Sequence, residues 1–179
     1  MAATPTRLMT VEEFFQLPED HGSRYELHHG ELVTLAPVKL KHFVIQGNLR
    51  DLFRKVAEPE SLTDIEMAFR PLPEHEFWIA DVADLSAKRF RSADPEDNIR
   101  GAPDLVVEVL SPSNTAAEML DKEQICLANG AREFWVVDPN RRHVKVTNSE
   151  GRTKLYHCGQ EIPLPMFGNA SFAVDSIFV

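Results

Sequence analysis

The chain has 179 residues, 43% of them hydrophobic, which predicts one globular domain over residues 1–179 with a sizeable core. Its formal net charge of −9 argues against a general phosphate-backbone binder, since such binding depends on clustered Lys and Arg; a local basic groove stays compatible with it. No run reaches the roughly 18–20 apolar residues of a membrane helix, and residues 1–7 lack a signal-peptide core. Cys126 and Cys158 give neither a disulfide framework nor metal-ligand spacing, so we expect a cytoplasmic protein with no membrane partner.

The first half of the chain predicts two helices and four strands. Thr10 and Glu13 form a capping box ahead of an apolar run, which predicts a short helix that ends before Pro18. Alternation then predicts two strands around a tight turn, and apolar residues at helical spacing predict one long amphipathic helix. The predicted ranges are strands at 24–27 and 32–36, a helix at 39–57, and strands at 62–69 and 76–82.

The second half predicts a strand–helix–strand unit between residues 104 and 137. Residues 86–101 are polar and charged, which predicts a surface loop. A helix at 114–129, with Ser113 or Asn114 as its cap and Gly130 at its end, joins strands that should be parallel, because such crossovers are right-handed. A hairpin (143–147 and 153–157) and a short strand near 171–174 follow. With antiparallel earlier strands, these elements predict an α/β (α+β) fold, a mixed sheet flanked by helices.

One carboxylate inside the second half is not explained by hydrophobicity. Glu108 lies in a strand that is otherwise almost wholly apolar, where a carboxylate costs free energy unless a partner or a metal compensates it. Asp104 shares its face but lies about 13 Å away along the strand, so we interpret Asp104 as structural. A partner from an adjacent strand is required, and Asp81, the single acid of the apolar run 77–83, fits best.

A lysine on the helix that follows Glu108 completes the candidate site. Lys122 borders the helix face that packs on the sheet, so its amine can reach the sheet edge. Mg²⁺ binds one or two carboxylates plus waters, polarises a phosphate and lowers the pKa of a bound water. A nearby lysine orients that water or offsets developing charge. The set Asp81, Glu108 and Lys122 therefore predicts phosphodiester hydrolysis.

Three stretches of the sequence resemble the Uma-type restriction endonuclease family of the PD-(D/E)XK nuclease superfamily. They are Arg24-Tyr25-Glu26-Leu27-His28-His29-Gly30-Glu31-Leu32, then Pro103-Asp104-Leu105-Val106-Val107-Glu108-Val109-Leu110-Ser111-Pro112-Ser113, and Lys122 through Gly130 to Phe134-Trp135-Val136-Val137-Asp138-Pro139. The resemblance runs from about Met9 to the C-terminus. It implies a restriction-endonuclease-like fold, dependence on Mg²⁺ with Mn²⁺ able to substitute, and cleavage of DNA.

The same resemblance implies roles for four residues. Asp81 and Glu108 correspond to the metal-binding acids, and Lys122 to a catalytic lysine displaced to the following helix, because the in-strand position here is Leu110. Glu31 corresponds to an upstream acid that assists catalysis. Symmetric cleavage of duplex DNA favours a homodimer.

Each assignment has an alternative. The alternative for Glu108 is a buried ion pair, for Asp81 a loop cap, for Lys122 a snorkelling surface lysine, and for Glu31 a hairpin ion pair. His42 falls either beside the site or in solvent. For the whole chain, the alternatives are a catalytically inactive nuclease-fold binding or regulatory module, motivated by the acidic charge, and a metal-dependent hydrolase of other phosphoesters.

Overall fold

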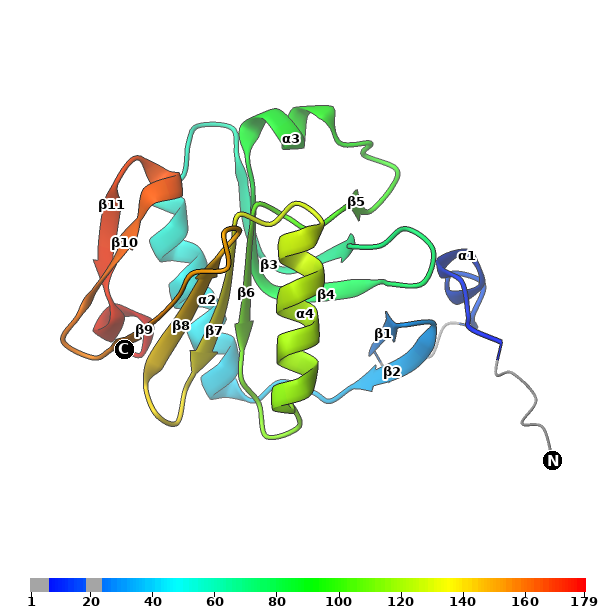
Figure 1. Ribbon diagram of the computed structural model, residues 1–179, viewed down its shortest axis with the longest axis horizontal. Helices are drawn as coiled ribbons and strands as arrows, with labels where there is room; N and C mark the ends of the chain where they lie inside the picture. The colour runs from blue at the N-terminus through cyan, green and yellow to red at the C-terminus, as the bar shows by residue number, and fades with distance from the viewer. Residues whose placement is uncertain (1–6, 19–23) are drawn as a thin grey trace.

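The computed structural model describes residues 7–18 and 24–179 and is built on a seven-stranded mixed sheet. The strand order is β5-β3-β4-β6-β7-β8-β9, and helices α2 and α4 cover opposite faces of this sheet (Figure 1). Two further pairs, β1–β2 and β10–β11, flank it. The strands are β1 (Arg24–His28), β2 (Glu31–Leu35), β3 (Leu62–Arg70), β4 (Trp78–Leu85), β5 (Ile99–Arg100), β6 (Leu105–Val109), β7 (Glu133–Asp138), β8 (His143–Asn148), β9 (Thr153–His157), β10 (Glu161–Leu164) and β11 (Ala170–Ala173). The helices are α1 (Val11–Phe14), α2 (Leu40–Arg54), α3 (Ala87–Ser92), α4 (Ala116–Ala128) and the 3₁₀ turns η1 (Pro165–Phe167) and η2 (Val174–Ile177).

Strand directions confirm the predicted fold class. β6 and β7 pair in parallel and are joined through α4, as the crossover requires. β3–β4, β4–β6, β7–β8 and β8–β9 are antiparallel. Across the described residues, no helix has both the length and the apolar character that a membrane crossing requires.

The alternation of β6 sorts its side chains between two core clusters. Leu105, Val107 and Val109 pack in the cluster that contains the buried face of α2. Val106 packs in the cluster that contains Cys126 of α4. Because side chains alternate along a strand, Glu108 falls on the α4 side, the side from which Lys122 approaches.

β3 and β4 both depart from regular strand geometry, in a shared kink at Glu66 and Asp81. Glu66 and Asp81 face each other by register but form no ladder pair, and Glu66 has a φ of 55°, in the left-handed region. The ladder pair Ile65–Val82, before the kink, packs on the α2 side of the sheet. The pair Met67–Ala80, after the kink, packs on the α4 side. Asp81 therefore lies where the strand changes faces.

Three local predictions were wrong. The predicted loop at 86–101 contains α3 and β5; α3 buries only Ala87, and β5 has two residues, so neither shows a hydrophobic period. α4 is capped by Thr115, which accepts from the Glu118 amide in a second capping box, and not by Ser113 or Asn114. The C-terminal segment contains β10 as well as β11.

The turn between β5 and β6 yields a stability prediction. Gly101 has a φ of 77°, and a Cβ there would lie 2.8 Å from the main-chain oxygen of Asn129. Gly159 has a similar φ of 82° but meets nothing within 4 Å. We expect Gly159→Ala to cost about 1–2 kcal/mol from backbone strain alone. Gly101→Ala should cost distinctly more in urea denaturation; equal losses would contradict the close contact.

Candidate active site

A buried lysine stands at the centre of the polar cluster. Lys122, on α4, has a side chain only 8% exposed, so it is not a snorkelling surface residue. Its Nζ lies 3.4 Å from Glu26 Oε2 and 3.4 Å from Glu108 Oε1, and 5.6 Å from the centre of the Trp78 ring. These contacts place the amine over β6, a central strand of the sheet, and tie α4 to β1 and β6.

The charges in this cluster shift one another's titration. Burial, together with the charges of Asp81 and Glu26, raises the pKa of Glu108 to about 8, against the opposing effect of Lys122. Burial lowers the pKa of Lys122, but Glu108, Glu26 and Asp81 outweigh it and raise that pKa above its usual value. The ammonium is therefore charged at neutral pH, and it serves as a cation and hydrogen-bond donor, not as a base.

Asp81, the predicted metal-binding partner of Glu108, lies at the kink of β4. The β4–β6 ladder ends at Val82–Val107, so one further step along the register places Asp81 beside Glu108. Asp81 Oδ2 accepts a 2.6 Å hydrogen bond from the Val109 amide, in place of a backbone carbonyl. The sequence prediction that Asp81 neighbours Glu108 on an adjacent strand is thus matched by the arrangement of the sheet.

Helix α2 supplies two side chains that fix Asp81. His42 Nε2 lies 2.9 Å from Asp81 Oδ1, and Gln46 Nε2 donates to the same oxygen at 2.8 Å and to Glu66 Oε1 at 2.5 Å. Burial lowers the pKa of His42, but the hydrogen bond with Asp81 and the charges of Asp81 and Glu66 together outweigh burial and raise that pKa above its usual value. Among the residues that the structure describes, the buried Gln46 Oε1 has no hydrogen-bond partner. His42 therefore lies beside the site and not in solvent.

Glu26 belongs to the cluster, although the sequence analysis did not single it out. Mutual backbone bonds between Leu27 and Phe77 of 2.9 and 3.0 Å attach β1 to the start of β4. Glu26 Oε1 accepts from the Ile79 amide at 2.7 Å, and Oε2 lies 2.6 Å from His28 Nε2. Burial raises the pKa of Glu26, but His28 and Lys122 lower it more. An isolated acid between Tyr25 and Leu27 was the available signal, the same one that marked Glu108.

Glu31, the predicted upstream acid, lies beyond the β1–β2 turn. It pairs by register with His28 and its side chain is exposed. Within residues 7–18 and 24–179, no hydrogen bond or ion pair joins Glu31 to Lys122 or to the acids around it. Its catalytic role stays a prediction.

The oxygen donors of the cluster suit a hard, hydrated cation. Asp81 and Glu108 come from neighbouring strands, and the unpartnered Gln46 Oε1 lies beside Asp81. In the described part of the chain, no three or more His, Cys, Asp or Glu side chains are arranged to hold a metal by themselves. Mg²⁺ keeps several waters and needs only one or two protein carboxylates, so the donor set fits it.

The titration of Glu108 gives a pH prediction for the metal-free protein. The folded-state pKa is raised above the ordinary Glu value of 4.5, to about 8. Folding stability from this group is therefore present below about pH 4.5 and lost as pH rises toward 8, with a slope of at most about 1.4 kcal/mol per pH unit. Glu108→Gln should remove that slope, so its stability relative to wild type rises from pH 5 to pH 8.

Urea denaturation in EDTA across that pH range measures the difference between the two curves. Glu96→Gln, at an exposed side chain with no ion pair among the described residues, controls for the loss of one negative charge. Parallel curves for wild type and Glu108→Gln would contradict the raised pKa.

Comparison with known proteins identifies the family and the fold of this chain. The family model Uma2, described as "putative restriction endonuclease", matches residues 11–175. The crystal structure of "a putative nuclease belonging to DUF820" from Anabaena variabilis is similar, with a TM-score of 0.80 and 21% sequence identity. That alignment covers 95% of this chain and 97% of the other, so the two share a fold. No curated protein matches the chain.

Proposed function

Since this chain belongs to the Uma2 restriction endonuclease family, we propose that it is a Mg²⁺-dependent endonuclease that hydrolyses DNA phosphodiester bonds. The observation that carries the proposal is the buried Lys122 ammonium, held 3.4 Å from both Glu26 and Glu108 and electrostatically coupled to Asp81. A structural core needs neither a buried lysine nor the acids that compensate it, whereas phosphate hydrolysis uses carboxylates that can hold a metal and a cation close to the developing charge.

Each residue has a task that follows from its contacts. Asp81 and Glu108 would hold Mg²⁺ (or Mn²⁺), which when bound would polarise the phosphate and lower the pKa of a water. Lys122 donates hydrogen bonds to the attacking water or to the phosphate oxygen on which negative charge grows. Glu26 holds the ammonium in place, and His42 and Gln46 fix the carboxylate of Asp81.

Hydrolysis places these groups in a balanced reaction. The water oxygen bonds to phosphorus as the water loses one proton to solvent, the phosphorus–oxygen ester bond breaks, and the departing alkoxide takes up one proton from solvent. Catalysis here consists of positioning and of offsetting charge, which buried groups with fixed hydrogen bonds do without reorganising.

The functional unit we propose is a homodimer, because two sites related by a two-fold axis match the two strands of duplex DNA. β2 offers a surface for self-association, since Leu32 and Val33 are 41% and 37% exposed. Sedimentation of the purified protein measures its oligomeric state.

Substitutions separate metal binding from the chemical step. Asp81→Asn and Glu108→Ala should abolish Mg²⁺ binding by calorimetry and nicking of plasmid DNA. Lys122→Met should retain Mg²⁺ binding yet lose about 10²–10³-fold in cleavage rate, because it removes a cation aimed at developing charge.

Unchanged metal binding and cleavage in Glu108→Ala would refute the assignment. DNA binding by a wild-type protein that binds neither Mg²⁺ nor Mn²⁺ in calorimetry and cuts no DNA would favour the inactive binding-module alternative. Cleavage of small phosphoesters alone would favour a hydrolase of another substrate class.

A second pair of variants decides which upstream acid takes part. Glu26→Gln removes the negative charge 3.4 Å from Lys122 Nζ, so we expect a loss of about tenfold or more in cleavage rate. Glu31→Gln changes an exposed side chain on the same hairpin and serves as the matched control. A loss confined to Glu31→Gln would restore the role that sequence resemblance gave to Glu31.

A further inference from the structure

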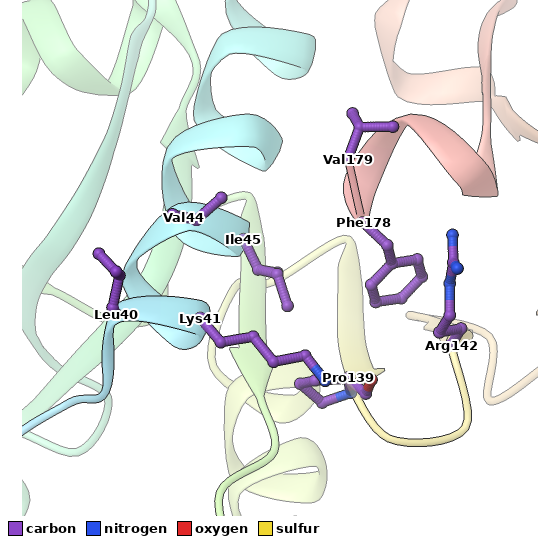
Figure 2. A pocket seen from close by; sticks show the side chains of 8 residues that line it. All are labelled: Leu40, Lys41, Val44, Ile45, Pro139, Arg142, Phe178 and Val179. Carbon is purple, nitrogen blue, oxygen red and sulfur yellow. Dashed lines mark hydrogen bonds between the residues drawn. The ribbon is translucent and has the colours of Figure 1, made fainter.

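A hollow of about 490 Å³ opens beside the first two turns of α2 (Figure 2). Its lining combines an apolar face with two cationic side chains. Figure 2 places Lys41 beside Pro139 at one end, and Arg142 beside the Phe178 ring. The apolar lining includes Leu40, Val44, Ile45 and Phe178, and the cations are Lys41 and Arg142.

The hollow and the active site lie on different sides of the same helix, α2. His42 and Gln46 contact Asp81, whereas their neighbours Lys41 and Ile45 line the hollow. An α-helix is about 10–12 Å across, so a chain that leaves the site over α2 reaches the hollow within a few nucleotides. On the sheet side, Pro139 follows β7, the strand that pairs with β6 and Glu108.

Both cations are available to an anion. Lys41 Nζ donates one hydrogen bond, of 2.8 Å, to Pro139 O and keeps two donors. Arg142 packs 5.6 Å from the centre of the Phe178 ring and has a φ of 51°. Within the described residues, neither side chain forms an ion pair with a carboxylate, although the charge of Asp175 acts on Arg142.

The local sequence is unfavourable for an isolated helix end. Lys39, the N-cap residue of α2, makes no side-chain capping hydrogen bond, and the first turn of the helix carries no acid. Positive charge at a helix N-terminus opposes the helix dipole, whereas a bound anion would be stabilised there. Leu40 is 78% exposed at the same place, although an apolar side chain gains free energy from burial.

We propose that this hollow binds the nucleic-acid strand next to the cleaved bond. Lys41 and Arg142 contact its phosphates, and Leu40, Val44 and Phe178 pack against sugar and base. The identity of the ligand rests on the proposed nuclease function; the cationic, apolar hollow itself does not. A strand is favoured over a second copy of the chain, because the hollow sets apolar side chains beside two cations, which matches the bases and sugars of a strand beside its phosphates.

Binding without cleavage tests the hollow directly. A short fluorescein-labelled single-stranded DNA is titrated with the full chain in EDTA, at several salt concentrations, and anisotropy is measured. Lys41→Met and Arg142→Gln should each weaken binding roughly tenfold and make the salt dependence shallower by about 0.7 in log–log slope, the value for one lost phosphate contact. Leu40→Ala should weaken binding with an unchanged slope, because it removes packing but no charge.

Lys88→Met and Arg91→Gln remove the same charges from α3 and serve as matched controls. All five side chains are exposed in the native fold, and circular dichroism checks that each variant is folded.

Equal losses in the hollow and α3 variants would overturn the proposal, since they would show general electrostatic attraction. Absence of DNA binding by wild type would overturn it as well, as would dissociation of a dimer by Lys41→Met in sedimentation. If wild type cleaves nothing but the hollow variants alone lose DNA binding, the nuclease function fails while the strand-binding site stands.

Discussion

The structure depends on one buried ammonium and the acids that compensate it. Lys122 is 8% exposed in its side chain, and desolvation of a lone cation would cost several kcal/mol. Glu26 and Glu108 contact it directly, and Asp81 acts on it through its charge. These acids arrive on β1, β6 and β4, so the compensation of one charge requires the hairpin, the sheet and α4 to be in place together.

The kink shared by β3 and β4 links the sheet to this cluster. A regular ladder would engage the backbone of Asp81 with that of Glu66, but here the pair is missing and Glu66 takes a left-handed φ. The carboxylate of Asp81 then accepts the Val109 amide and meets α2. Such strain persists where the surroundings hold it, and here Gln46 bridges the two kinked residues.

Much of the fold could be predicted because its signals are local. The capping box at Thr10, the apolar run around Glu108 and the helical period of α2 each lie within a few consecutive residues. The crossover then fixed the parallel pairing of β6 and β7, since its hand is nearly invariant. β5 escaped prediction because two residues carry no period, and it pairs only through β3.

The sequence by itself determined the mixed sheet, the crossover, the identity of Asp81 and Glu108 as acids out of place in apolar strands, and the position of Lys122 at the border of the helix face that packs on the sheet. An unpaired acid or lysine in a buried element is visible along the chain, because burial follows from periodicity. Only the tertiary structure decided that Glu26, and not Glu31, contacts Lys122, because that depends on how the hairpin docks through Leu27 and Phe77. It also decided where Lys41 and Arg142 meet, since a hollow exists only where elements distant in sequence pack side by side.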